Sequence, residues 1–551
     1  MGQKLKYSLL IAGISGLFFT LFLGGVHLFD WDEINFAEIS REMLLTRDYT
    51  RVYINFQPFW EKPPLFFWLQ ALAMAGMGVG EFAARFPNAV CGAVTLVVIY
   101  RIGRQFFSHR FGLLWAGAYF GSVLPFLYFK SGIIDPWFNL FIFLGLYHFL
   151  LFHWKKNGYE GIPLRKSYWT YLFWAGFFTG MGILTKGQVA YLIVCLTLGV
   201  YWIYQRFRFY VNIPQFLFFT LAATLVTLIW YGTETLKNGT WFIEAFNRYQ
   251  YRLFSTHDAG HKGFPGYHFA VLLVGCFPAS IFAIRAFFAQ PAEETDQQND
   301  FRRWMKFLFW VVLILFSIVQ SKIVHYSSMC YFPLTFLAAL VMDKITGNKL
   351  ALSRWMKFGL WMIGGVYMAA TIILPFAARN AERWKFLIKD PFGKANLDAA
   401  VHWTGWEAAA GFLLLAAVLV FFRYARKNNW RTAWPALFGG TAVFIMLTLA
   451  GFIGRIEGYS QRAAIEFFTA KADEDCYIIT KGYKSYAHLF YARKRPVSDT
   501  RSYDENWLFT GKTDKPVYVV TKINKTAELE KMPGLKEIGR KNGFVFYQRI
   551  D

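Results

Sequence analysis

The chain has 551 residues, of which 56% are hydrophobic and 20% aromatic. Its mean hydropathy of +0.30 excludes an ordinary soluble enzyme and predicts a mostly α-helical, polytopic membrane protein. The net charge of +23 also occurs in nucleic-acid-binding proteins, but here the Lys and Arg residues form short clusters between apolar runs. Because loops that stay in the cytoplasm have this pattern, we expect no nucleic-acid partner.

The first apolar run follows a short positive leader, MGQKLKYS, and extends to Phe29. It is long enough to cross a bilayer, and no small-residue cleavage pattern follows it. We therefore interpret it as a retained first span and not as a signal peptide.

Apolar runs of about 17 to 25 residues predict about 13 membrane spans. They lie near residues 7–29, 86–106, 111–129, 134–154, 168–185, 188–205, 213–231, 267–288, 305–321, 325–342, 357–377, 407–423 and 434–454. The basic turns between them fall on the side of Lys4 and Lys6, provided that residues 63–79 do not cross. Cytoplasmic loops are rich in Lys and Arg, so we expect a cytoplasmic N-terminus and a re-entrant or interfacial helix at 63–79.

This topology divides the chain into a transmembrane catalytic domain, residues 1–454, and a tail, residues 455–551. Loop 30–85 is expected to be extracytoplasmic, with juxtamembrane helices, and loop 232–266 lies on the same side. In the tail, CYIIT, PVYVVTK and GFVFYQRI have strand-like patterns, whereas SQRAAIEFFTAKA and SYAHLFYAR are helical. The tail therefore predicts a small soluble α/β domain on the extracytoplasmic side.

Loop 30–85 concentrates charge directly after the first span. Asp32 and Glu33 open an amphipathic stretch, and Glu61 and Lys62 precede two prolines. Carboxylates at the start of a helix are often only solvated, since the helix dipole favours them there. The convergence of two charged clusters at a membrane surface instead indicates a catalytic base or a metal-assisting carboxylate.

Several cations lie on the expected extracytoplasmic side, where the positive-inside bias disfavours them. They are Lys62, Lys186, Arg248, Arg252 and Lys322. Such side chains can extend along apolar surface to reach the headgroups, but their number on one face favours a site for a phosphate group. Tyr326, four residues after Lys322, is positioned to donate to a phosphate oxygen or to anchor the membrane interface.

Acidic and histidine residues in two further turns are candidates for a metal site. Asp135, in GIIDPWF, either caps a helix or belongs to the site. The loop FSTHDAGHKGFPGYH provides His257, Asp258, His261 and His268. Their spacing suits a divalent cation bound through imidazole and carboxylate, although histidine-rich loops are more often merely polar. The loop is therefore either a divalent-metal site or a polar surface loop.

The order of these motifs resembles that of a known family. DE followed by FAEISREML, EKPP with FW, DP after a short turn, ILTKG, an Arg with DAGH, and SK-x-x-x-Y appear in sequence. They are similar to those of the GT-C class of membrane glycosyltransferases, above all the lipid A 4-amino-4-deoxy-L-arabinose transferases and the protein O-mannosyltransferases. One departure is Val324–His325, where the family carries a Pro-Thr-like pair before the tyrosine.

The resemblance implies a bacterial inner-membrane enzyme that transfers a sugar from a polyprenyl-phosphate-linked donor to an extracytoplasmic acceptor, either a glycolipid such as lipid A or a protein. Asp32 matches the family's catalytic carboxylate. Lys62 and either Arg248 or Arg252 match residues that bind the lipid phosphate, and Tyr326 matches the tyrosine after the SK-type lysine. Glu61 would lie near the metal-binding part of the site.

A transporter or flippase for lipid-linked sugars is the alternative from another class. Transport sites usually have charged or broken-helix features near the bilayer midplane and paired repeats. The predicted spans are nearly free of acidic residues in their middles, and the charges concentrate at one surface. This distribution favours surface chemistry.

Overall fold

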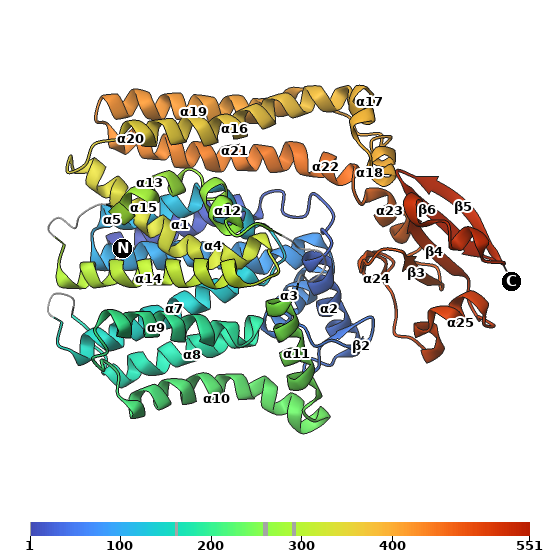
Figure 1. Ribbon diagram of the computed structural model, residues 1–551, viewed down its shortest axis with the longest axis horizontal. Coiled ribbons are helices and arrows are strands. Elements are labelled where there is room, and N and C mark those ends of the chain that lie inside the picture. The colour runs from blue at the N-terminus through green and yellow to red at the C-terminus, as the bar shows by residue number, and fades with distance from the viewer. Residues whose placement is uncertain (1, 160–162, 257–262, 289–293, 551) are drawn as a thin grey trace.

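The computed structural model describes residues 2–159, 163–256, 263–288 and 294–550, and most of them are helical. Long helices run side by side through one body, and the C-terminal domain lies at one end of it (Figure 1). The chain is therefore a polytopic helical protein with a small α/β appendage, as its composition predicts.

Within the described ranges, seven helical segments are long and apolar enough to cross a membrane by length and composition. They are α4 (Glu81–Phe106), α7 (Asp135–Lys156), α10 (Ile213–Asn238), η2 with α15 (Val324–Cys330 and Tyr331–Thr346), α16 (Arg354–Arg379), η4 with α19 (Trp406–Ala408 and Ala409–Arg426), and the run from α20 (Trp430–Trp434) through η5 (Pro435–Gly439), α21 (Gly440–Thr448) and η6 (Leu449–Ile453) to α22 (Gly454–Gly458). An eighth candidate is a bent pair, α12 (Tyr267–Gly275) and α13 (Ala279–Phe288).

The bent pair differs from the single straight span expected at 267–288. The helix direction bends by 118° between α12 and α13. Pro278 lies at the break, and because proline has no N–H to donate and its ring clashes with the preceding turn, a straight helix cannot continue through it.

Other helices occupy expected spans without meeting that standard of length and composition. They are α1 (Gln3–Thr20), α5 with α6 (His109–Phe120 and Val123–Tyr128), α8 (Tyr168–Lys186), α9 (Val189–Tyr204) and α14 (Asp296–Ile318). α9 has only 16 residues, fewer than the ~20 that a perpendicular span needs. The count of about thirteen spans therefore stays a prediction. α3 (Leu65–Met77), with 13 residues, is likewise short for a crossing.

Close packing inside the body depends on particular glycines. A Cβ added at Gly112 of α5 would lie 2.5 Å from the Tyr100 carbonyl oxygen, and one at Gly103 of α4 would lie 2.9 Å from the Gly112 Cα. Small residues facing one another in this way let two helices approach closely. The contact fixes α5 against α4, the helix that connects the two ends of the body.

The C-terminal domain is built on a four-stranded sheet with the order β3-β4-β6-β5. The strands are β3 (Tyr477–Lys481), β4 (Val517–Lys522), β5 (Leu535–Lys541) and β6 (Phe544–Arg549). β3 and β4 are parallel, and the other two pairs are antiparallel. The remaining helices and strands are α2 (Asp32–Thr46), β1 (Tyr53–Ile54), β2 (Gln57–Pro58), α11 (Trp241–Ser255), α17 (Ala381–Trp384), α18 (Pro391–Asn396), α23 (Arg462–Ala470), α24 (Ala487–Tyr491) and α25 (Glu505–Thr510).

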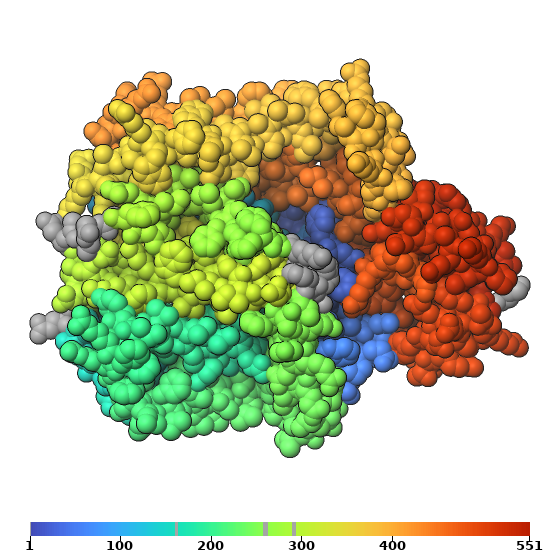
Figure 2. Space-filling model, viewed as in Figure 1, coloured from blue at the N-terminus to red at the C-terminus, as the bar shows by residue number. Residues whose placement is uncertain are grey.

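The domain packs against the loop that follows the first span, and Figure 2 shows its red surface beside the blue N-terminal segments. Leu28 and Ile34 share one hydrophobic cluster with Phe468, Phe490 and Tyr518 of the domain. Burial of apolar area shared by two sequence-distant segments stabilises both together. The two parts therefore have a common core.

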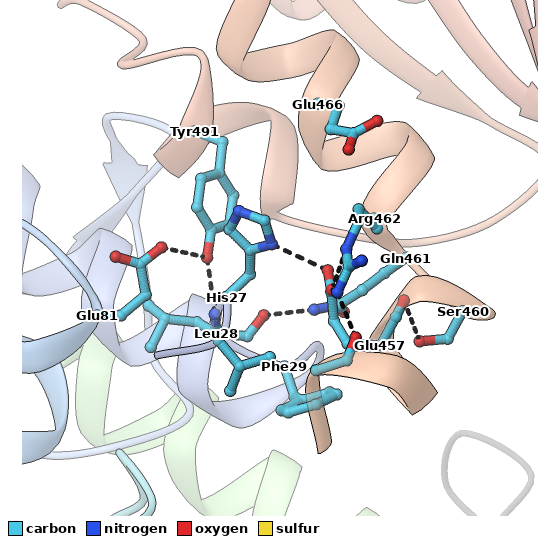
Figure 3. Close-up of polar contacts among 12 residues, drawn as sticks. His27, Leu28, Phe29, Glu81, Glu457, Ser460, Gln461, Arg462, Glu466 and Tyr491 are labelled. Atoms are coloured by element: carbon cyan, nitrogen blue, oxygen red, sulfur yellow. Dashed lines mark hydrogen bonds and ion pairs between the residues drawn. The ribbon is translucent and has the colours of Figure 1, made fainter. Parts of the chain in front are cut away.

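Polar contacts reinforce this interface (Figure 3). The Leu28 N–H donates to the Tyr491 hydroxyl oxygen at 2.7 Å, and the Leu28 carbonyl accepts from Gln461 Nε2 at 2.7 Å. His27 Nδ1 lies 2.9 Å from Glu457 Oε1, and Glu457 also accepts from Arg462 Nε at 2.6 Å. The backbone just before Asp32 is thus held by side chains from the far end of the chain.

A buried charge network joins α2 to the same domain. Arg41 donates to both carboxylate oxygens of Glu38, at 2.7 and 2.6 Å, and to the Lys494 carbonyl at 2.7 Å. Glu42 accepts from the Phe56 N–H at 2.8 Å and is fully buried. Burial, and then the neighbouring charge of Glu38, raise the pKa of Glu42 well above its ordinary value.

Glu42→Gln tests whether the buried carboxylate of Glu42 destabilises the folded protein when it is charged. A carboxyl group whose pKa is raised on folding destabilises the folded state once the pH rises above its unfolded value of 4.5. Glu42→Gln reproduces the protonated shape without the charge, so its melting temperature should exceed that of the wild type at pH 8 and match it near pH 5. Thermal unfolding in detergent across this pH range measures the difference, and a Glu38→Gln control should instead melt lower at both values, because Arg41 loses its partner.

Candidate active site

A charged site lies where the helical body meets the C-terminal domain, at the end of the body that carries α2 and α3 (Figure 1). Asp32 is the first residue of α2, Asp135 the first of α7 and Lys186 the last of α8, while His325 and Tyr326 belong to η2. Acids at helix N-termini and a base at a C-terminus are favoured by the helix dipole. The position of these helix ends therefore explains why Asp32, Asp135 and Lys186 lie at the same end of the helical body.

His325 lies between two carboxylates. Its Nε2 is 3.7 Å from Asp32 Oδ2 and 4.0 Å from Asp135 Oδ2. Lys186 Nζ donates to Asp135 Oδ1 at 2.6 Å. The Asp32 side chain is 30% exposed and that of Asp135 is 3% exposed. Asp32 is thus the carboxylate that a substrate can reach, whereas Asp135 is already neutralised by Lys186.

A second group of cations surrounds Tyr249 of α11. Lys62 Nζ lies 3.4 Å from the Tyr249 hydroxyl oxygen and 4.8 Å from the ring centroid. The Arg252 guanidinium carbon lies 5.3 Å from the same centroid. Cation–π contacts of this kind hold a cation over the face of an aromatic ring. Lys62 and Arg252 are thereby brought to one aromatic side chain.

Tyr326 connects the two groups. Lys186 Nζ lies 5.3 Å from its ring centroid, and the charges of Lys62, Asp32 and Asp135 all act on its hydroxyl. The carboxylate centre and the cationic group therefore form one continuous site, with Asp32 at its accessible edge.

Glu33, next to Asp32, has a different environment. Its carboxylate accepts from Arg85 Nε at 3.0 Å and from Nη2 at 2.8 Å, and from the N–H groups of Phe29 at 3.0 Å and Gly132 at 2.6 Å. Burial alone would raise the pKa of Glu33, but the charge and hydrogen bonds of Arg85 hold it below its ordinary value. A carboxylate with four donors is a structural anchor.

Two of the expected phosphate ligands have other surroundings. Lys322 Nζ donates to the carbonyl oxygens of Phe316 at 3.2 Å, Ser317 at 2.6 Å and Val319 at 2.5 Å. These carbonyls end α14, so Lys322 caps a helix C-terminus. Arg248 is exposed on α11. Neither is joined by a described contact to the group around Tyr249.

The structure describes only part of the predicted metal site, namely Glu61 and His268, whose Nδ1 lies 3.2 Å from Ser327 Oγ. No group of three or more His, Cys, Asp or Glu side chains with suitable spacing occurs among the described residues, and the ammonium of Lys186 already binds the buried carboxylate of Asp135. Glu61 lies beside Tyr486 of the C-terminal domain, where burial and then the charge of Glu61 raise the pKa of Tyr486 to about 12. His257, Asp258 and His261 lie outside the described residues. We derive no step through a metal.

The sequence did not single out His325, Tyr249 or Arg85. His325 is visible as a histidine directly before Tyr326, at the position where the family pattern departs. Tyr249 lies in RYQYR, three residues before Arg252. Arg85 directly precedes the span predicted at 86–106, and an arginine at the edge of an apolar span suggests an acidic partner nearby.

The chain was compared with known proteins. Residues 61–230 match the family described as dolichyl-phosphate-mannose-protein mannosyltransferase. The undecaprenyl phosphate-alpha-4-amino-4-deoxy-L-arabinose arabinosyl transferase of Pseudomonas aeruginosa (strain LESB58) is 26% identical over 571 residues, which cover 99% of this chain and 98% of the relative. The enzyme of the same description from Pectobacterium carotovorum subsp. carotovorum (strain PC1) is 24% identical over 464 residues, covering 82% of this chain and 76% of the relative.

A solved structure, ArnT from Cupriavidus metallidurans bound to undecaprenyl phosphate, aligns with a TM-score of 0.76 over 98% of both chains at 17% identity. The two proteins therefore share a fold that includes the C-terminal domain. Together these comparisons confirm the resemblance inferred from the order of the motifs.

The Glu33 environment generates a prediction about stability. Glu33→Gln leaves the charge of Arg85 buried without its partner, which costs about 3–5 kcal/mol, so the variant should melt well below the wild type in detergent. The neighbouring Asp32→Asn is the matched control and should melt normally, because Asp32 is partly exposed. Since the folded pKa of Glu33 lies below 4.5, the stabilisation is complete at neutral pH and is lost as the pH falls through the folded value. Equal melting of both variants would contradict the anchor role.

Proposed function

We propose that this chain, a GT-C class membrane glycosyltransferase that resembles the aminoarabinose and protein O-mannosyl transferases, moves a sugar from a polyprenyl phosphate to an acceptor at a membrane surface. In its finer form the proposal takes undecaprenyl phosphate as the lipid, and lipid A or another cell-envelope glycolipid as the acceptor. The descriptions of relatives that match nearly the whole chain support both. The proposed location is the bacterial inner membrane, with the N-terminus in the cytoplasm and the site on the periplasmic side.

The observation that carries the proposal is the reachable carboxylate of Asp32 beside the cations around Tyr249. Transfer breaks the bond between the sugar C1 and a phosphate oxygen, and the electron pair leaves with polyprenyl phosphate. Negative charge therefore grows on the departing phosphate. Fixed cations at that point lower the barrier because they are already oriented when the charge develops.

Lys62 and Arg252 are the best-placed groups for that phosphate. Both lie close to the Tyr249 ring, with Lys62 Nζ 4.8 Å and the Arg252 guanidinium carbon 5.3 Å from its centroid, whereas Lys186 is paired with Asp135 and Lys322 with helix carbonyls. The Lys186 ammonium already has a buried anionic partner, whereas Lys62 contacts a hydroxyl and an aromatic ring. We therefore assign Lys62 to the phosphate, with Arg252 as the second cation at the same ring, and Lys186 to the positioning of Asp135.

Asp32 acts on the acceptor. An acceptor hydroxyl attacks C1, the new C–O bond forms, and the hydroxyl proton passes to Asp32, which is a general base in this step. His325, 3.7 Å away, orients the Asp32 carboxylate. An anionic phosphate acceptor would need orientation more than deprotonation.

Asp32→Asn tests the base. It removes the charge without changing the volume, so release of polyprenyl phosphate should fall by about 10²–10⁴-fold while the melting temperature stays that of the wild type. The assay incubates the purified protein with a polyprenyl-phosphate-linked sugar and candidate glycolipid or protein acceptors. The products identify the acceptor by mass spectrometry. A wild-type rate in the variant would remove Asp32 from the mechanism, and movement of donor across liposomes without release would favour a flippase.

Lys62→Ala tests the phosphate contact. Loss of one charge-assisted hydrogen bond should raise the KM for the donor at least tenfold with little change in stability. Lys322→Ala is the comparison variant, because it leaves three carbonyl oxygens at the end of α14 without their donor. It should lower the melting temperature while the KM for the donor stays close to that of the wild type. An unchanged KM in Lys62→Ala would remove Lys62 from the phosphate site.

A further inference from the structure

An apolar groove opens at the end of the body opposite the active site. It has a volume of about 520 Å³, within the range of ligand pockets in proteins. Residues of α1, α5, α15 and the start of the last long helix form its walls, among them Ile11, Ile14, Leu113, Phe120, Trp434 and Phe438. Ile14 is 46% exposed, so the groove is reached from the side of the helical body.

Glycines keep the groove open. Gly117 of α5 and Gly439 of η5 both line it, and a Cβ added at either would meet no atom within 4 Å. At Gly112, five residues earlier on α5, a Cβ would instead lie 2.5 Å from the Tyr100 carbonyl oxygen. Close packing explains that glycine, whereas at Gly117 and Gly439 the missing side chain leaves open space in the groove that a larger side chain would fill.

Polar groups collect at one end of the groove. Arg110 and Arg431 line it there. Arg110 pairs with Asp343 at 2.7 Å and is half-exposed, while Arg431 is exposed and has no ion-pair partner among the described residues. The Trp430 indole Nε1 is enclosed by protein atoms and is not a donor that a ligand in the groove reaches. The two guanidinium groups suit an anion with several oxygen atoms.

We propose that this groove binds an anionic glycerophospholipid, with its phosphate at Arg431 and Arg110 and one acyl chain along Gly117 and Phe120. From Arg110 to Phe120 an α-helix rises roughly 15 Å, about half of the ~30 Å hydrocarbon thickness of a bilayer. The groove thus has the depth of one leaflet, with its cations at headgroup level. That leaflet is the one facing the basic turns.

The donor lipid is a poorer occupant. Its phosphate belongs at Lys62 and Arg252, and α4, which separates that end from Arg110, has 26 residues, about 39 Å of helix. A polyprenyl chain of many isoprene units would also extend far beyond a groove of one leaflet's depth. A two-chain phospholipid places one chain in the groove and leaves the other in the bilayer.

Native mass spectrometry of the full chain in detergent tests the proposal, with equal amounts of phosphatidylglycerol and phosphatidylethanolamine of the same acyl chains. The wild type should retain phosphatidylglycerol preferentially. Arg431→Ala should reduce that preference about fivefold, as expected for one cation at a headgroup. Arg426→Ala, an exposed cation on the same side but outside the groove, is the matched control and should retain the wild-type preference.

Variants that fill the groove distinguish lipid binding in the groove from nonspecific attraction to the charged surface. Gly117→Leu and Gly439→Leu should each reduce retention of both lipids severalfold while the protein without added lipid melts as the wild type does. Equal retention of the two lipids by the wild type would overturn the proposal. So would equal losses in Arg431→Ala and Arg426→Ala, or stronger competition for the groove by undecaprenyl phosphate than by phosphatidylglycerol.

Discussion

The buried ion pair between Glu33 and Arg85 determines where Asp32 lies. Besides Glu33, Arg85 donates to the carbonyl oxygens of Leu23 at 3.0 Å, Val26 at 2.9 Å and His27 at 3.0 Å. One guanidinium therefore ties the end of the first span to the start of α2 through α4. Such a pair contributes little net stability but is costly to break, which suits an element that must have one position. With Glu33 directed inward, its neighbour Asp32 is directed toward the accessible edge of the site.

The same reasoning sorts the lysines. The partners of four described lysines differ. Lys130 and Lys322 donate to carbonyl oxygens at helix ends, Lys186 binds a carboxylate, and Lys62 contacts an aromatic ring. In a low-dielectric environment a cation needs oxygen atoms around it. Where the protein supplies them, the cation is structural. Where an aromatic face takes part of that role, the cation remains able to bind a substrate anion.

The sequence predicted more of the fold than of the site. Apolar runs and strand patterns in the tail located most long helices and three of the four strands, because hydrophobic periodicity is local. β5, LKEIGRK, was missed because it is an exposed edge strand, rich in charge as such strands often are. The motifs placed Asp32, Asp135 and Lys186 near one another, but no local pattern separates the reachable Asp32 from the anchored Glu33. That difference comes from Arg85, which is 52 residues further along the chain.

The C-terminal domain also fixes the position of the residues before Asp32. Lys484 Nζ lies 4.4 Å from the Trp31 ring centroid, Ser485 donates to Asp30, and Tyr486 stands beside both Trp31 and Glu61. The residues directly before Asp32 are therefore held by Arg85 from within the body and by the domain from outside it. A functional side chain is held precisely when the elements around it are themselves fixed. The domain contacts Asp30 and Trp31 on the side that the helical body does not cover, so both parts of the chain fix the start of α2.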